Sequence, residues 1–181
     1  MDPQFALAYM ALVDQYFLIG DRRHSNELMV KLDPLQSRLP RYEQLLLQTL
    51  KDSHSRDEEA EIRARQELLT QFPRDSENRG ILSHDLAYIG QQDQALDVIR
   101  QGLALDAKNE DLLNFESYVL AKWGDFDGAL KASDAYIAVR PGDPNPLDGR
   151  GDILFMAGRD DDAVAAYRKA LETEAGLQRL W

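Results

Sequence analysis

The chain of 181 residues contains no cysteine and no long uninterrupted apolar run. Without cysteine it cannot form disulfides, thiolate metal sites or a cysteine nucleophile. Its longest apolar stretch, residues 5–20, contains Asp14 and Gln15 and is too short and too polar for a membrane span. The first residues also lack the basic start of a signal peptide. We therefore expect a soluble, cytoplasmic protein with no membrane partner.

Basic side chains are scarce as well. The chain has 21 lysines and arginines against 32 aspartates and glutamates, which gives a formal net charge of −11. Because an acidic surface repels phosphate backbones, no nucleic-acid partner is expected. Hydrophobic residues make up 44% of the chain, enough to build a core and to argue against disorder. The length is that of one ordinary domain, so a single domain over residues 1–181 is expected.

Motifs of catalysis and metal binding are missing too. The sequence has no Gly-rich phosphate loop, no Gly-x-Ser-x-Gly turn and no His-Glu-x-x-His. Its histidines, His24, His54 and His84, occupy different positions in the repeat described below, so they should not converge on a metal ion. The acidic run 160–162 is more typical of the first turn of a helix than of a calcium loop. We expect no enzymatic activity, no cofactor and no metal.

What the sequence does contain is an internal repeat, in which similar residues return at a fixed interval of about 34 residues. Its last three units agree at six positions, which chance rarely produces. Several of these positions hold small residues, which would let two helices approach closely. The recurring residues are Ser83, Ser117 and Gly151; Leu86, Leu120 and Leu154; Gly90, Gly124 and Gly158; Ala95, Ala129 and Ala163; Leu96, Leu130 and Val164; and Leu103, Ile137 and Leu171.

Each unit is predicted to form two helices. In the fourth unit, Leu113 and Leu120 mark the apolar side of a first helix. Gly124 suits the left-handed residue that closes it, and Asp125 stands where a second helix would begin. Pro141 follows the second helix, because proline cannot continue it. The sequence therefore predicts a helical hairpin in every unit.

The same frame extends to the start of the chain with more drift. In the second unit, Arg56 occupies the glycine position and Glu61 the alanine position. The segment 33–40 contains two prolines and is predicted to be a longer connection. We expect about five hairpins, or ten helices, in one solenoid. Their approximate bounds are 4–34, 41–73, 75–108, 109–142 and 143–175, with a short C-terminal helical segment at 176–181.

This pattern of large apolar, small, glycine, alanine and aromatic positions resembles the tetratricopeptide repeat (TPR). The resemblance implies an all-α, right-handed superhelical solenoid of antiparallel helix pairs. It also implies a scaffold without chemistry of its own, which binds a peptide or partner segment in a concave groove. The best copy of the pattern is the last, with Leu147, Gly151, Leu154, Gly158, Ala163, Tyr167 and Ala170.

The resemblance further indicates which residues would line the groove. They mix aromatic and acidic side chains, which favours a protein partner with basic or apolar segments. The alternative interpretation is that the aromatic residues pack between helices and the aspartates form an ordinary solvated face. The predicted groove residues are Met10, Asp14, Phe17, His84, Tyr88, Asn114, Tyr118, Lys122, Asp148, Asp152 and Phe155, with Leu46, Leu50 and Gly80 at the matching positions of the second and third units.

Two residues depart from the family's pattern. Glu116 and Arg150 stand where the repeat usually has leucine, at equivalent places on neighbouring first helices. We predict that they face each other as an ion pair. The alternative is two separately solvated side chains.

Three alternatives concern the wider role of the chain. The interruption at residues 38–40 is similar to that of TPR regions in bacterial kinases and transcriptional regulators, so a regulatory or sensory region is one of them. The ends look cut from a longer protein, and exposed solenoid ends could pair into a homo-oligomer. A helical repeat that binds nucleic acid is disfavoured by the acidic charge.

Overall fold

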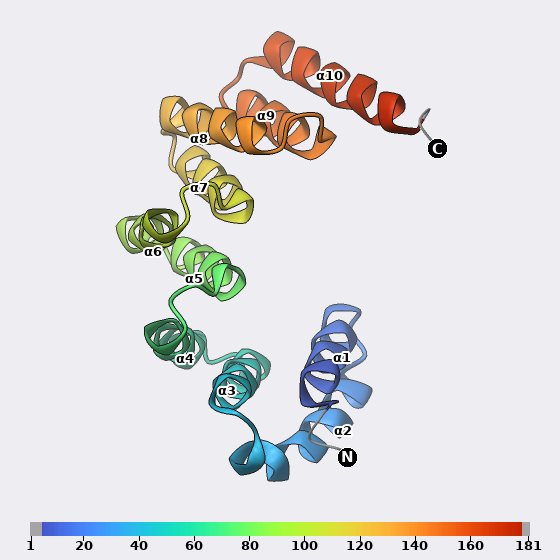
Figure 1. Ribbon diagram of the computed structural model, residues 1–181, viewed down its shortest axis with the longest axis vertical. Coiled ribbons are helices and arrows are strands. Elements are labelled where there is room, and N and C mark those ends of the chain that lie inside the picture. The colour runs from blue at the N-terminus through green and yellow to red at the C-terminus, as the bar shows by residue number, and fades with distance from the viewer. Residues whose placement is uncertain (1–4, 179–181) are drawn as a thin grey trace. The chain divides into compact units, whose positions relative to one another are not determined.

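The computed structural model describes the backbone of residues 5–178 and the side chains of residues 5–173. Within that range the chain forms ten α-helices and one 3-10 helix, and no strand (Figure 1). The predicted all-α class is confirmed. The chain divides into two compact units, Met1–Asp75 and Ser76–Trp181. The single solenoid domain expected from the sequence stays a prediction.

The second unit contains three regular hairpins. Its first helices begin at residues 76, 110 and 144 and its second helices at 92, 126 and 160, so the repeat interval is confirmed there. The last helix runs on to residue 178. It includes residues 176–178 of the predicted C-terminal helical segment, and residues 179–181 lie outside the described range. The helices are α5 (Ser76–Tyr88), α6 (Gln92–Leu105), α7 (Glu110–Lys122), α8 (Phe126–Val139), α9 (Pro144–Met156) and α10 (Asp160–Gln178).

The first unit contains two less regular hairpins. Its connection 33–38, predicted as a long link, folds as a 3-10 helix, and Leu39 behind it is buried in the core. That core joins Met10 and Val13 to Leu32 and Leu47. The elements are α1 (Ala6–Leu18), α2 (Arg22–Leu32), η2 (Asp33–Arg38), α3 (Arg41–Ser55) and α4 (Glu58–Gln71).

The turn inside each hairpin follows from its glycine. Gly124 has a φ of 84°, and its N–H donates to the carbonyl oxygen of Ala121. Asp125 then caps α8, because its carboxylate accepts from the N–H of Gly128. Arg56 takes the same left-handed conformation in the second hairpin, with a φ of 60°. A side chain there costs about 1–2 kcal/mol that glycine would avoid.

Small residues bring the two helices of each hairpin together, as predicted. Ala95, Ala129 and Ala163 are all essentially inaccessible to solvent. On the facing first helices, Ser117 is buried, and a Cβ on Gly151 would lie 2.3 Å from the ring of a facing tyrosine. Since larger side chains would force the helices apart, these positions set the hairpin spacing.

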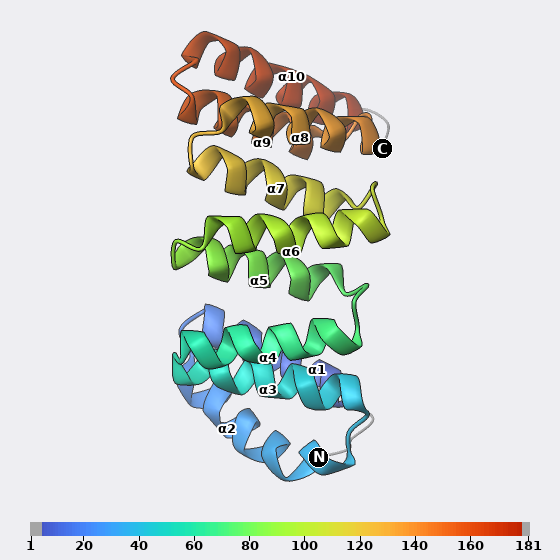
Figure 2. The ribbon, with the colours of Figure 1, turned by 90° about the vertical axis from the view of Figure 1, so that its left-hand side faces the viewer.

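Successive hairpins in the second unit pack in a regular way (Figure 2). The first helices contact one another in order, α5 with α7 and α7 with α9. Each second helix also packs on the next first helix, α6 on α7 and α8 on α9. The first helices of the second unit thus form a continuous layer.

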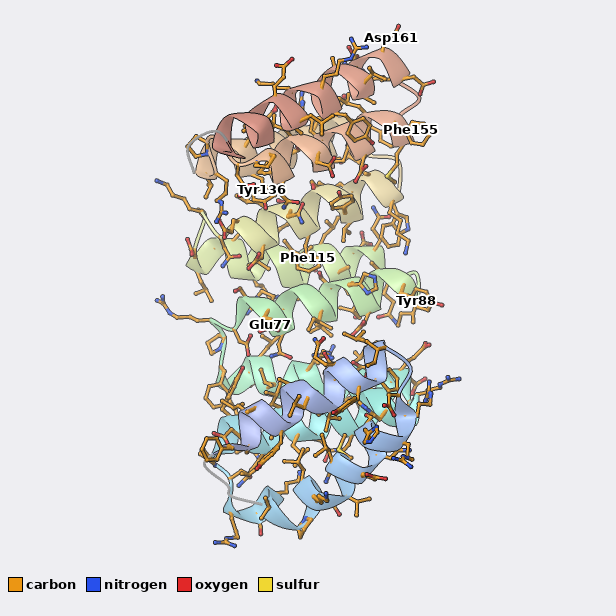
Figure 3. The ribbon with its side chains drawn as sticks, turned by 90° about the vertical axis from the view of Figure 1, so that its right-hand side faces the viewer. Glu77, Tyr88, Phe115, Tyr136, Phe155 and Asp161 are labelled. Atoms are coloured by element: carbon orange, nitrogen blue, oxygen red, sulfur yellow. The ribbon has the colours of Figure 1, made fainter. Side chains whose placement is uncertain are left out.

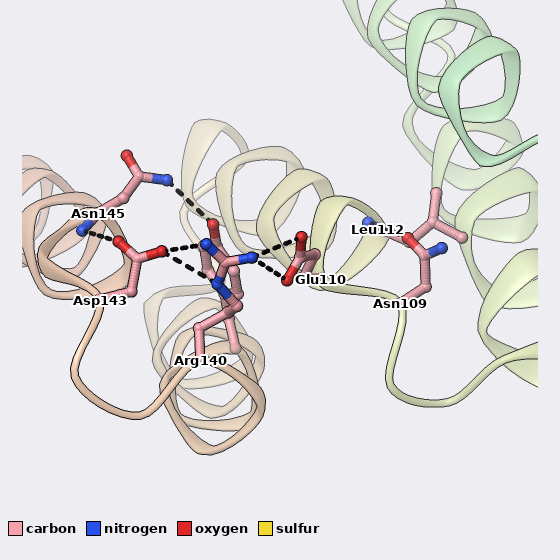
Figure 4. Close-up of polar contacts among 7 residues, drawn as sticks. Asn109, Glu110, Leu112, Arg140, Asp143 and Asn145 are labelled. Atoms are coloured by element: carbon pink, nitrogen blue, oxygen red, sulfur yellow. Dashed lines mark hydrogen bonds and ion pairs between the residues drawn. The ribbon is translucent and has the colours of Figure 1, made fainter.

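One arginine ties three helix ends together (Figure 4). Arg140, after α8, donates to both carboxylate oxygens of Glu110 at 3.0 Å and to Asp143 at 2.5 Å. Asp143 also accepts from the backbone N–H of Asn145, whose side chain donates to Tyr136. The backbone hydrogen bond and then Arg140 hold the pKa of Asp143 below its usual range. This network fixes the starts of α7 and α9 against the end of α8.

Candidate functional site

The outer side of the first helices in the second unit carries most of the predicted groove residues. We call this surface the first-helix face. It has aromatic and cationic groups near the C-terminal ends of α5 and α7 and acidic groups on α9. It consists of His84 and Tyr88 on α5, Asn114, Tyr118 and Lys122 on α7, and Asp148 and Asp152 on α9.

Tyr88 and Lys122 meet at one end of this face. The ammonium nitrogen of Lys122 lies 5.8 Å from the centroid of the Tyr88 ring and 5.4 Å from that of Trp123. It also donates to the carbonyl oxygen of Ala87 at 3.5 Å, where a cation complements the C-terminal end of α5. Tyr88 nevertheless stays 70% exposed, and Figure 3 shows it projecting from the end of its helix. Its ring is therefore free to contact a partner.

Asp152 is held between two phenols in the middle of the face. Tyr118 donates to one carboxylate oxygen at 2.7 Å, and Tyr167 of α10 donates to the other at 2.8 Å. The hydrogen bond to Asp152 raises the pKa of Tyr167 to about 12, and burial followed by the same bond raises the pKa of Tyr118. Both phenols thus remain donors at neutral pH, and Asp152 is fixed in position.

Asp148 lies one turn earlier on α9 and is exposed. It lines an open hollow between α9 and α10, together with Tyr167, Ala170 and Leu171. Within the described part of the chain, no ion pair joins Asp148 or Asp152 to a basic side chain. This part of the face therefore carries uncompensated negative charge beside aromatic and apolar surface.

Comparison with known proteins identifies the fold. No protein-family model and no curated protein sequence matches the chain. Solved structures do. A crystal structure of MamA is 22% identical with a TM-score of 0.64, over 97% of this chain and 95% of that one. A thermophilic TPR protein of Thermus thermophilus is 20% identical with a TM-score of 0.72, over 93% and 91%. A TPR protein of Parabacteroides merdae is 16% identical, also with a TM-score of 0.72, over 95% and 66%.

The chain has the TPR fold. The hairpins described above are TPR hairpins, and the resemblance inferred from the sequence is confirmed at that level. Among the described residues, no helix is both long and apolar enough to cross a bilayer. The same residues include no group of acidic side chains and histidines placed to hold a metal ion.

Of the groove residues predicted in the first TPR hairpin, Asp14 alone is exposed. Met10 is only 3% exposed, because it turns into the core against α2 and α3, so its assignment to a groove was wrong. The centroid of the Phe17 ring lies 4.3 Å from that of the His54 ring and 4.8 Å from the guanidinium carbon of Arg22. The Phe17 ring fills the junction of three helices rather than an open surface.

Leu46 and Leu50 of the second TPR hairpin pack against the core of the first unit. Gly80 of the third hairpin is buried beneath the ring of Phe115. None of these three residues offers an open surface in the way that the groove prediction requires.

Phe155 also departs from its prediction. It stands one repeat after Ala121, which is 2% exposed because the next first helix covers it, whereas Phe155 is 65% exposed. The TPR position that matches Tyr88 and Lys122 is held by Met156 instead. Phe155 therefore lies on the side of α9 that would meet a following helix, at the edge of the second unit in Figure 3.

The predicted ion pair between Glu116 and Arg150 was wrong. Glu116 lies 3.4 Å from Arg100 of α6, and Arg150 lies 2.6 Å from Asp134 of α8. Each side chain pairs with the second helix of the preceding TPR hairpin, because first helices meet along another stripe.

Tyr167 was missed as a site residue. Tyr167 stands at the aromatic position of the repeat. The sequence pattern at that position does not indicate that the tyrosine hydroxyl bonds to a residue of α9. Of its equivalents in the two preceding repeats, Ile99 has no hydroxyl and the buried hydroxyl of Ser133 has no hydrogen-bond partner among the described residues.

Proposed function

We propose that the chain is a non-catalytic protein-interaction module, and that the first-helix face of the second unit binds a basic segment of a partner protein. The observation that carries this proposal is the pair of carboxylates on α9 that lack a basic partner. TPR-fold neighbours are consistent with a scaffold, and this chain's own carboxylates indicate the partner's chemistry.

The hollow beside Asp148 suits a lysine or arginine side chain. Its aliphatic stem would lie along Ala170 and the ring of Tyr167, and its charged head would reach the carboxylate of Asp148. Such side chains bury their methylene groups while keeping the charge solvated. The hollow would thus recognise both parts of the side chain.

Asp152 supports the same preference from a fixed position. Two of its roughly four acceptor sites are used by phenols, and the others remain for a donor. Because its orientation is already set, a partner loses little additional side-chain freedom on binding. Exposed Tyr88, further along the face, would add the large aromatic contact that interfaces favour.

The test measures binding of a fluorescein-labelled peptide in which leucine and lysine alternate, by anisotropy. A peptide with glutamate in place of lysine serves as the reference. We expect the lysine peptide to bind and Asp148→Asn to weaken it about threefold, the size of one exposed ion pair. Added salt should weaken binding further.

The matched control is Asp161→Asn. Asp161 is an exposed aspartate in the first turn of α10, so its replacement changes the net charge equally (Figure 3). An equal loss of binding in both variants would show that only overall charge matters and would overturn the proposal. Tighter binding of the glutamate peptide would overturn it as well.

A further inference from the structure

Two successive junctions of the second unit use the same ion-pair position with reversed charges. At the first, Arg100 of α6 contacts Glu116 of α7 at 3.4 Å. At the second, Asp134 of α8 contacts Arg150 of α9 at 2.6 Å. Both residues of the second pair follow those of the first by one repeat. At both junctions this ion pair joins a second helix to the next first helix, and either helix can carry the arginine.

Residue size is reversed at the same two junctions. A Cβ on Gly80 would lie 2.2 Å from the ring of Phe115, so a small residue on α5 faces a large one on α7. One repeat later, a Cβ on Gly149 of α9 would lie 3.8 Å from the amide oxygen of Asn114 and 3.2 Å from the hydroxyl of Tyr118, both on α7. On α7 and on α9, the residue size and the charge thus match the hairpin that precedes the helix.

A third copy of the charged position stands on α10. Arg168 follows Asp134 by one repeat, is exposed, and forms no ion pair with another described residue. Around it Val164, Leu171 and Phe155 are 47%, 64% and 65% exposed. We call these four residues the end face. At the earlier junctions the equivalents of Arg168 pair with a following first helix, and Ala87 and Ala121, the equivalents of Phe155, are buried.

We propose that the end face binds an amphipathic helix of a partner protein, docked as α7 docks on α5 and α6, which carries a carboxylate opposite Arg168. Arg168 has the charge of Arg100, whose partner is Glu116, so the docked helix needs an acidic residue at that position. Asp148 follows Asn114 by one repeat and has a side chain of similar size. Because Asn114 lies against Gly149, the docked helix needs a similarly small residue against Asp148, directly before its own carboxylate residue.

A second copy of this chain does not meet the charge requirement. The equivalents of Glu116 on the other first helices are Leu12, Gln48, Leu82 and Arg150. The carboxylate of Glu116 itself is taken up by Arg100. Charge complementarity therefore favours a helix with a carboxylate at that position over a second copy of this chain. The end face shares Leu171 with the hollow beside Asp148, but its ligand is acidic, whereas the ligand proposed for the first-helix face is basic.

The test uses the full chain and a stapled helical peptide with the sequence of residues 143–156 in which Arg150→Glu has been made. The peptide keeps the small residue of α9 and supplies the carboxylate. The comparison peptide retains Arg150. We expect the glutamate peptide to bind about threefold or more tightly than the arginine peptide, and Arg168→Glu to reverse that preference. Calorimetry provides the affinities.

Lys131→Glu is the matched control, since Lys131 is exposed on α8 and the change in net charge is the same. It should leave the preference between the peptides unchanged. Because residue 168 is exposed, Arg168→Glu should fold normally, which circular dichroism checks. Three results would overturn the proposal: no binding of the glutamate peptide, an unchanged preference in Arg168→Glu, or a concentration-dependent dimer that Arg168→Glu abolishes.

Discussion

Two junctions of the second unit can be compared: that of α5 and α6 with α7, and that of α7 and α8 with α9. Their contacting positions are one repeat apart, but the size and the charge of the contacting side chains are exchanged. One puts glycine against phenylalanine and arginine against glutamate. The other puts asparagine against glycine and aspartate against arginine. The repeat interval therefore determines where two helices meet, while the identity of each contact is decided separately at each junction. The contacting pair of positions recurs from repeat to repeat, whereas the residues at these positions do not.

The largest difference between the junctions should appear when a methyl group is added to each glycine. Gly80→Ala places a Cβ 2.2 Å from a ring carbon of Phe115, and the overpacking should lower the free energy of unfolding by about 1–3 kcal/mol. Gly149→Ala places a Cβ 3.2 Å from the Tyr118 hydroxyl and 3.8 Å from the Asn114 amide oxygen, and it gains up to about 1 kcal/mol of helix propensity. Urea unfolding measures both. Equal losses would contradict the reversed sizes.

A smaller effect is expected where a turn of the first unit departs from those of the second. Arg56 holds the left-handed conformation that glycine holds in the other hairpins, at a φ of 60°. Arg56→Gly should raise the free energy of unfolding of the first unit by about 0.5–1 kcal/mol, because the Cβ strain outweighs the added freedom of the unfolded chain. Thermal melting monitors the gain. The exposed substitution Arg63→Gly, inside α4, should instead destabilise by a similar amount.

The charge reversal is expected to contribute less. Asp134→Arg places two arginines together at the second junction and should cost about 0.5 kcal/mol, as exposed ion pairs do. Adding Arg150→Asp should restore the stability, since it recreates the polarity of the first junction. A double-mutant cycle in urea gives the coupling. Additive single effects would mean that the two side chains do not interact.

The last prediction concerns a contact inside the last hairpin, the hydrogen bond from Tyr167 of α10 to Asp152 of α9. The pKa of Tyr167 is raised to about 12 from an ordinary value near 10, chiefly by its bond to Asp152. A raised pKa contributes stability that is fully present below pH 10 and is lost as the pH rises to about 12. Tyrosinate absorbance should show this late titration. Asp152→Asn should move it to lower pH, and an unchanged curve would contradict the assignment.

The backbone was predictable from the sequence because glycine, alanine and proline act locally. Gly124 closes its helix through its own φ, and Ala129 is small whatever its neighbour is. Side-chain partners were less predictable. Glu116 and Arg150 share a register position, but a shared position does not mean a shared contact, since each faces the helix before it.

The candidate site shows the same limit. Tyr118 and Asp152 were predicted separately, and the structure brings them together at 2.7 Å. Phe155 was assigned one position away from the register that Tyr88 and Lys122 share. Because one residue turns a helix by about 100°, that step moves a side chain from the outer face to the next junction.

The paired reversals make the order of the hairpins matter. Excising α7 and α8 as one block, a whole repeat, would join α6 directly to α9 and leave every turn intact. Yet it would place Arg100 against Arg150, two like charges that repel. It would also place Gly80 against Gly149, where neither residue has a side chain to fill the space between the helices. Shortening this array by one hairpin would therefore yield a poorly matched protein rather than a smaller copy of the same one.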